Sequence, residues 1–186
     1  MSNTKVISEV PRRVVTGVRG GKSVVISDGL VPNAHVHAAT PGLVSAIAWG
    51  TSGHPELPAG QTDLAHPGLA VTPAQGETRL LIVKFPPDSV MAAPGFNPVA
   101  AGEEFATHLP GLAELFERDH PGMHTTESID YDIVIDGEIW LELDDSHLTY
   151  LRAGDVAIQC GTRHAWRNHS DRVTTMAFIL IGARRA

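Results

Sequence analysis

Polar residues occupy alternate positions at the start of the last third of the chain: His124, Thr126, Ser128 and Asp130. In an extended strand, residues two apart face the same side, so these four side chains are expected to point together. Polar groups are costly to bury without partners, so a polar interior face indicates a pocket that holds a ligand or water. Imidazole and carboxylate groups suit Fe(II), Mn(II), Ni(II), Zn(II) or Co(II).

A second segment, GDVAIQCGTRHAWRN from Gly154 to Asn168, contains another histidine, His164. It begins with a turn, continues as a short apolar strand and turns again before the histidine. Arg163 and Arg167 flank His164, and either guanidinium is suited to binding a substrate carboxylate. It is an equally good interpretation that both are ordinary exposed arginines at strand ends. Asn168 is expected to fix a turn.

Turn signals recur every eight to twelve residues from 129 onwards. We therefore expect short strands to position these residues. Strands are predicted at residues 129–135, 138–143, 147–151, 156–159, 165–168 and 173–181. Asp136-Gly137 lies between two apolar runs, which is a strong hairpin signal. The pattern predicts an all-β fold, an antiparallel barrel or sandwich, and excludes alternating βαβ units.

The first 121 residues carry weaker signals. Strands are predicted at 12–18 and 22–27, which form a hairpin around Gly20-Gly21, and at 43–49 and 79–85. Between them, residues 28–42 are expected to be turn-rich and residues 50–78 to form a long surface loop. Residues 88–102 are expected to be irregular, and 103–118 helical with a break at Pro110-Gly111. We expect residues 1–121 to be an N-terminal extension that adds strands and a short helical segment to one domain. Residues 122–186 then form its core.

Composition restricts the class of protein. The chain has 186 residues, a net charge of −7 and one cysteine, Cys160. Its basic residues are scattered, so nucleic acid is not an expected partner. The longest apolar runs are far shorter than the ~20 residues that span a bilayer, and the N-terminus lacks a signal-peptide core. We therefore expect a cytoplasmic protein with no disulfide framework and no membrane contact.

The two segments together resemble the motifs of the cupin superfamily. The first motif, G(X)5HXH(X)3,4E(X)6G, aligns with HTTESIDYDIVIDG when Gly137 is its closing glycine. His124 then matches the first histidine, Thr126 replaces the second, and Asp130 replaces the glutamate. The second motif, G(X)5PXG(X)2H(X)3N, matches at His164 and Asn168, with one residue fewer before the histidine. The resemblance covers residues 122–182.

The resemblance implies an antiparallel cupin barrel, also called a jelly roll or double-stranded β-helix, with a short helical segment before the first motif. It implies one divalent transition metal, Fe, Mn, Zn, Ni or Co, held by His124, Asp130 and His164. Aspartate is shorter than the usual glutamate, which leaves Glu127 as the alternative carboxylate. Cupin barrels commonly pair, so a homodimer is expected, and an open sheet edge is otherwise a hazard.

Two functions follow from the resemblance. The first is a metal-dependent enzyme, a lyase, isomerase or dioxygenase, acting on a small carbonyl or carboxylate compound by decarboxylation, dehydration, isomerisation or dioxygenation. Glu127 or Arg163 would supply acid–base or charge contacts in that enzyme. The alternative is a barrel that binds a small ligand without catalysis, which the loss of the second histidine at Thr126 favours. Fold alone does not decide the reaction.

Other candidates have more ordinary interpretations. His35 and His37 form an HxH pair without a carboxylate at motif spacing, which indicates an exposed loop or a dimer-contact arm. Cys160 lacks a CxxC neighbour and is expected to be a buried apolar residue rather than a nucleophile. Three aromatic side chains are expected to pack in the core: Trp140, Trp166 and Tyr131.

Overall fold

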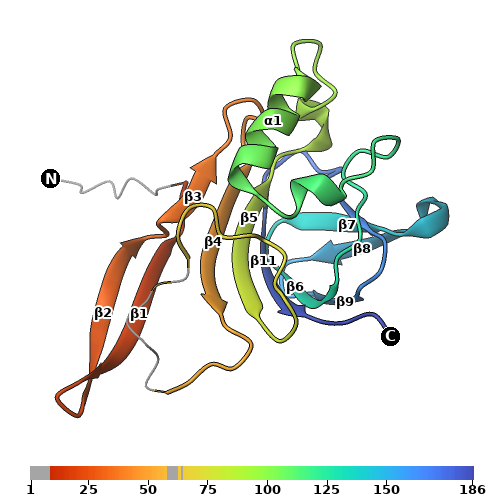
Figure 1. Ribbon diagram of the computed structural model, residues 1–186. Coiled ribbons are helices and arrows are strands. Elements are labelled where there is room, and N and C mark those ends of the chain that lie inside the picture. Colours follow the sequence, from red (N-terminus) through yellow and green to blue (C-terminus); the bar gives the residue numbers. More distant parts are fainter. Residues whose placement is uncertain (1–8, 58–62, 64) are drawn as a thin grey trace, which may run out of the picture.

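The computed structural model describes residues 9–57, 63 and 65–186 (Figure 1). Two antiparallel sheets form its body. The larger sheet has the strand order β3 (Asn33–Val36), β4 (Val44–Thr51), β5 (Thr78–Phe85), β11 (Thr174–Gly182), β6 (Ser128–Asp136) and β9 (Val156–Cys160). The smaller sheet has the order β10 (Ala165–Arg167), β7 (Glu138–Glu142) and β8 (Leu148–Arg152). This arrangement confirms the predicted all-β barrel.

A two-stranded hairpin, β1 (Arg12–Arg19) and β2 (Lys22–Leu30), projects from the body as an arm on the left of Figure 1. The prediction that residues 28–42 are turn-rich is wrong in part, because β2 continues to Leu30 and β3 occupies Asn33–Val36. Strand β3 pairs with β4, so this segment extends the larger sheet. Most of the described residues in the predicted loop at 50–78 are irregular, and Val71 among them is buried in the core; residues 58–62 and 64 lie outside the described part.

The predicted hairpin at Asp136-Gly137 is wrong, and the reason lies in the topology. Strand β6 pairs with β11 and β9, whereas β7 pairs with β10 and β8. The chain therefore passes from one sheet to the other at Gly137. This glycine has a φ of 90°, and a Cβ there would lie 2.5 Å from Thr174 Oγ1. Thr174 Oγ1 also donates to Glu138 O at 2.6 Å, which fixes the corner.

Apolar side chains fill the space between the sheets in two clusters. One cluster lies between the smaller sheet and the middle of the larger one, and its buried members are Val134, Ile139, Leu141, Leu151 and Met176. The other lies on the same inner face nearer β4, and its buried members are Ile47, Val71, Leu81, Val83, Leu109 and Leu180. The core is thus continuous along the concave face of the larger sheet.

One α-helix, α1 (Pro98–His108), covers the second cluster. It begins earlier than predicted because Asn97 accepts hydrogen bonds from Val99 N and Ala100 N, and proline suits the first helical turn. The break near Pro110 is confirmed. Three short 3₁₀ segments, η1 (Asp88–Val90), η2 (Ala113–Leu115) and η3 (Asp144–Ser146), complete the structure, and none of the described helices is long and apolar enough to cross a bilayer.

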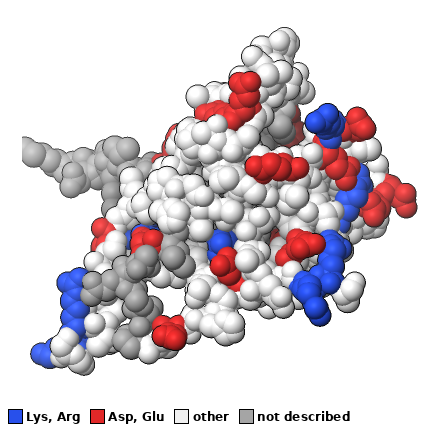
Figure 2. Space-filling view, viewed as in Figure 1, with Lys and Arg blue, Asp and Glu red and all other residues white. Residues whose placement is uncertain are grey.

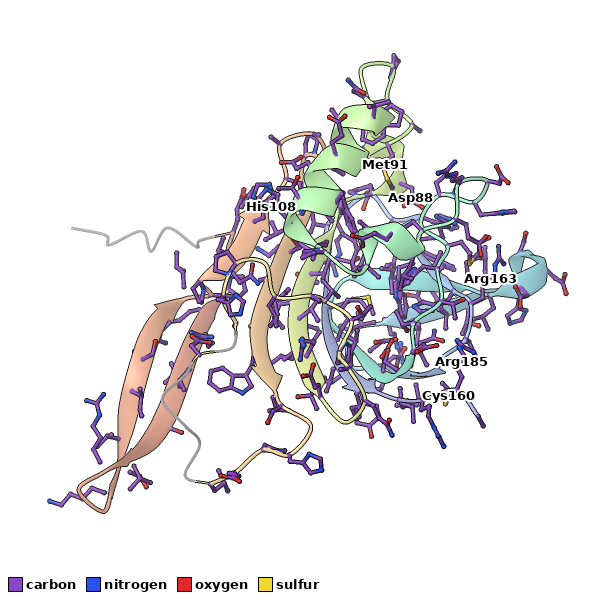
Figure 3. The ribbon with its side chains drawn as sticks, viewed as in Figure 1. Asp88, Met91, His108, Cys160, Arg163 and Arg185 are labelled. Atoms are coloured by element: carbon purple, nitrogen blue, oxygen red, sulfur yellow. The ribbon has the colours of Figure 1, made fainter. Side chains whose placement is uncertain are left out.

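The outer face of β6 and β9 is apolar and exposed. Tyr131 faces away from the interior as expected, but it is 42% exposed and does not belong to the core. Its cross-strand neighbour Ile158 is 55% exposed. Cys160, on the same face at the end of β9, is also exposed, which corrects the prediction that it is buried (Figure 3).

The corner at Gly137 yields a test of the fold. Gly137→Ala should lower the free energy of unfolding by more than about 1 kcal/mol, because it adds a clash with Thr174 to an unfavourable positive φ. Urea denaturation would measure the change. Gly154→Ala is the matched control: its φ is 94°, but nothing lies within 4 Å of the added Cβ. Equal losses in the two variants would show that the corner contact does not matter.

Candidate ligand site in the barrel interior

The two motif histidines meet across a short antiparallel bridge. His124 N donates to His164 O at 3.0 Å, and His164 N donates to His124 O at 2.9 Å. This reciprocal pair sets two residues directly opposite each other, so their side chains leave the backbone on the same side. The two imidazole centroids lie 4.4 Å apart. The bridge thereby brings together two residues that are separated by 39 residues in the sequence.

Hydrogen bonding fixes the same tautomer in both rings. His124 Nδ1 lies 3.0 Å from Gly122 O, and His164 Nδ1 lies 3.0 Å from Thr162 O. A carbonyl oxygen can only accept, so each Nδ1 carries the proton and each Nε2 has a free lone pair. Burial lowers the pKa of both imidazoles, that of His164 to about 4 with a contribution from His124. Both rings are therefore neutral at physiological pH.

The inner face of β6 is polar along most of its length. Thr126, Ser128, Asp130 and Asp132 are all buried, as the alternation in the sequence predicts for the first three. Asp132 was not singled out from the sequence, although it continues the same parity. Across the sheet, Asp130 pairs with Gln159 of β9, which is buried too. Sequence reasoning missed Gln159 because its register with β6 becomes known only from the fold.

Several of these buried groups lack hydrogen-bond partners within the described part of the chain. The atoms concerned are Ser128 Oγ, Asp130 Oδ1, both carboxylate oxygens of Asp132, and Gln159 Nε2. Buried polar atoms are normally paired, because leaving one unpaired costs about 1–3 kcal/mol. Their concentration on two neighbouring strands marks the place where a ligand would supply the missing partners.

Asp130 and Asp132 both have a raised pKa. Burial raises the pKa of Asp132 to about 8, and the neighbouring Asp130 charge adds to the effect. Burial also raises the pKa of Asp130. The site consequently combines two neutral imidazoles with carboxyl groups that keep a proton more readily than usual.

Asp130 is not close to both imidazoles. Thr126 Oγ1 donates to Asp130 Oδ2 at 3.4 Å, and the other carboxylate oxygen has no partner among the described residues. His124, Asp130 and His164 do not form a group whose ligand atoms all lie within 4.8 Å of one another; in the described ranges only His35, His37 and Glu104 do. Asp130 would therefore have to shift to place its carboxylate on one centre with both imidazoles.

The structure separates the two predicted catalytic residues from the interior. Glu127 lies in the bend that precedes β6, and its side chain is 71% exposed beside Arg185. The guanidinium of Arg163 donates to both carboxylate oxygens of Glu117 at 2.6 and 2.7 Å and to Asp144 at 2.8 Å. These partners raise the pKa of Arg163 and occupy its donors.

Other arginines on this side are engaged in the same way. Arg167 Nε donates to Glu142 at 2.5 Å, and its Nη1 donates to Pro121 O at 2.8 Å. Acidic and basic residues accordingly stand next to each other on the barrel side at the right of Figure 2. Arg163 and Arg185 both lie on this side in Figure 3. Neither predicted arginine has the free, inward guanidinium that substrate binding would need.

Asn168 has the turn-fixing role that the sequence predicts. Its Nδ2 donates to Phe85 O at 2.9 Å and to Arg172 O at 2.8 Å, while Oδ1 accepts from the Ser170 amide at 3.1 Å. These bonds tie the end of β10 to the end of β5. The predicted packing role of Trp166 also holds, since it contacts the core cluster around Ile139.

Two open clefts lie beside the barrel interior. The larger, about 540 Å³, is lined by Thr72, Pro73, Gly111, Leu115, Thr125, Glu127, Ser128 and Arg185. A neighbouring cleft of about 430 Å³ shares Glu127, Ser128 and Arg185 and extends along the C-terminal residues. Ser128 belongs both to these clefts and to the buried polar face of β6.

The predicted exposed loop at His35 and His37 is wrong. His37 is 2% exposed, and both rings lie against α1 with Glu104. No local sequence pattern indicates this cluster, because Glu104 lies 69 residues after His35.

Comparison with known proteins gives short but clear matches. The chain is 51% identical over 63 residues to "Phomopsin biosynthesis cluster protein C'" of Diaporthe leptostromiformis, covering 33% of each chain. It is 46% identical over 46 residues to "Cupin-domain-containing oxidoreductase virC" of Hypocrea virens, covering 25% of this chain and 24% of the relative. The matches thus span about a third or less of these curated relatives. No family model matches the chain.

Solved structures with similar folds include a putative ethanolamine utilization protein Q of Salmonella typhimurium, at 9% identity and a TM-score of 0.43, covering 94% of this chain and 98% of that one. A Cupin_2 domain of an XRE family transcriptional regulator of Enterobacter cloacae matches at 14% identity and a TM-score of 0.35, and the match covers 57% of this chain and 83% of that one. The matched segment of this chain is thus similar to cupin-domain proteins, in agreement with the two motif-like segments and the two-sheet barrel.

The raised pKa of Asp132 predicts how stability depends on pH. Unfolded, the carboxyl titrates near 3.8; folded, it keeps its proton to about 8. Between these values the folded state binds more protons, so raising the pH destabilises it, by up to about 1.4 kcal/mol per pH unit. Asp132→Asn should remove this loss and make the protein more stable than wild type at pH 7.

Urea denaturation of EDTA-treated protein at several pH values between 5 and 8 would measure this effect. Asp171→Asn, at an exposed loop position, is the control and should keep the wild-type slope. Parallel pH profiles for Asp132→Asn and wild type would contradict the assignment.

Proposed function

We propose that the barrel interior binds one divalent transition metal through His124 and His164 and that the protein is a metal-dependent enzyme acting on a small organic molecule. The observation that carries this proposal is the matched pair of imidazoles. Each ring donates Nδ1–H to a backbone carbonyl, an arrangement that typically orients metal-binding histidines, and each presents a free Nε2. Neutral imidazoles with fixed rings need little reorganisation to bind a metal.

Asp130 is the carboxylate proposed to complete the set. Its Oδ1 is buried and unpaired among the described residues, and it stands on the same strand face as Thr126. Glu127 is the weaker candidate, because its exposed side chain points away from the interior. In this arrangement Asp132 and Ser128 remain available to contact the substrate.

A metal held here would supply Lewis acidity toward a carbonyl or carboxylate oxygen, or redox chemistry. Residues of the chain would supply the proton and the hydrogen bonds to the substrate. Burial raises the pKa of Asp132 to about 8, so this carboxyl group holds a proton at neutral pH and could donate it to a substrate oxygen. Ser128 and Gln159 offer further hydrogen-bonding atoms. Of the reactions that remain open, oxidation is favoured, since two relatives are named cupin-domain-containing oxidoreductases.

A second candidate function is a non-catalytic cupin that binds a small polar ligand. The observation that favours it is Thr126, which stands where the cupin motif has its second histidine and donates instead to Asp130. In that case the unpaired atoms of β6 and β9 would contact the ligand directly. Metal content distinguishes the two functions.

Metal analysis of untagged protein is the test. We expect wild type to bind transition metal after reconstitution, and His124→Ala and His164→Ala each to lose one equivalent, because each removes one of the two fixed nitrogens. Elemental analysis after gel filtration would measure the stoichiometry.

Glu127→Gln is the matched control for Asp130→Asn. If Asp130 is the third ligand, Asp130→Asn should weaken metal binding by about tenfold or more while Glu127→Gln leaves it unchanged. Folded wild-type protein whose metal content does not change in either histidine variant would overturn the proposal and favour the non-catalytic function.

A further inference from the structure

A second group of metal-ligating side chains lies outside the barrel motifs, where α1 meets the edge of the larger sheet. His35 is on β3, His37 follows that strand directly, and Glu104 is on α1. The two histidines are two residues apart, so both face the inner side of the sheet, where α1 covers them. Figure 3 shows His108 at the end of α1 next to this edge of the sheet.

The three side chains converge. His35 Nε2 lies 2.7 Å from Glu104 Oε1, and His37 Nδ1 lies 4.0 Å from Glu104 Oε2. Ligand atoms of all three residues lie within 4.8 Å of one another, and no other group of three or more His, Cys, Asp or Glu among the described residues meets that condition. Two nitrogens and a carboxylate on one small centre form a donor set that suits Zn(II), Co(II) or Ni(II).

Neighbouring groups hold the donors in place. Glu104 Oε1 accepts from Ala38 N and Oε2 accepts from Ala39 N, both at 2.8 Å, so the carboxylate is fixed. His37 Nε2 lies 2.9 Å from Ser45 Oγ. When His37 donates to that hydroxyl, its Nδ1 keeps a free lone pair on the side of Glu104. Fixed outer contacts of this kind orient metal ligands.

The His35 ring is also held from its other face. His108 stacks on it with a centroid distance of 3.4 Å and an interplanar angle of 7°. The stacked ring restricts the movement of His35, whose Nε2 is directed at Glu104.

This cluster is separate from the barrel histidines. Two phenylalanines lie between them: Phe105 contacts His37 at a centroid distance of 5.9 Å, Phe116 contacts Phe105 at 5.1 Å, and His124 contacts Phe116 at 5.1 Å. A substitution in one cluster therefore leaves the ligands of the other untouched.

We propose that His35, His37 and Glu104 form a second divalent-metal site, which binds Zn(II) and fastens α1 to the edge strand β3. Because α1 covers the apolar cluster around Ile47 and Leu81, a metal at this junction stabilises the cover of the core. The competing interpretation is a metal-free clamp, in which the same three residues hold α1 by hydrogen bonds alone.

The test uses untagged, EDTA-treated protein with His124→Ala and His164→Ala, so that the barrel pair is absent. Zn(II) is added and measured by equilibrium dialysis with elemental analysis, and Co(II) is followed by its visible absorption. We expect about one equivalent of metal to remain and to raise the Tm. Adding Glu104→Gln should weaken binding by at least about tenfold and abolish the rise in Tm.

Glu103→Gln is the matched control, because Glu103 is an exposed neighbour on the same helix. His66→Ala is the histidine control, at an exposed loop position. Both should bind Zn(II) as their parent does. If the barrel double variant fails to fold, the same comparison in otherwise wild-type protein should show Glu104→Gln losing one equivalent and Glu103→Gln losing none.

Two results would overturn the proposal. One is a folded protein without the barrel pair that binds no Zn(II) or Co(II). The other is metal binding that is equally strong in Glu104→Gln and Glu103→Gln. Either would leave the cluster as a metal-free clamp.

Discussion

The interior of this barrel contains several buried polar atoms that have no hydrogen-bond partner in the described part of the chain. Strand β6 directs Ser128, Asp130 and Asp132 inward, and β9 adds Gln159 opposite them. A barrel of this size is usually filled with apolar side chains, as its other end is around Ile139 and Met176. The unsatisfied atoms are costly for folding, so they are best explained by a ligand that pairs with them.

The rest of the structure places the two motif histidines beside that polar face. Their reciprocal backbone bridge draws the segment before β6 to the segment before β10, and the corner at Gly137 allows β6 and β7 to join different sheets. Carbonyl groups then fix each imidazole as the same tautomer. The position of the two histidines therefore depends on the backbone at three places: the bridge between them, the corner at Gly137 and the carbonyl groups that accept from their rings.

Much of this arrangement could be predicted from residue types and spacing. The inward parity of His124 to Asp130 follows from strand geometry, and the strands from 129 onwards follow from short apolar runs between turns. The corner at Gly137 could not be predicted, because a two-residue hairpin and a sheet-to-sheet crossing have the same local sequence. Only the pairing partners of β6 and β7 distinguish them.

Long-range contacts explain the remaining errors. His35 and His37 looked unsupported because their carboxylate partner lies on a helix about seventy residues later. Glu127 and Arg163 lie close in sequence to the motif histidines, but the Glu127 side chain is exposed beside Arg185 and Arg163 is held by Glu117 and Asp144. Contacts of this kind are set by the fold and cannot be derived from proximity in the sequence.

Anomalous diffraction from crystals of untagged protein soaked with Zn(II) would test the central claim most directly. The account predicts a peak within coordination distance of both His124 Nε2 and His164 Nε2, on the side that faces the polar interior of β6. A well-ordered barrel with no peak between these two nitrogens, at a Zn(II) concentration that fills other sites, would contradict it.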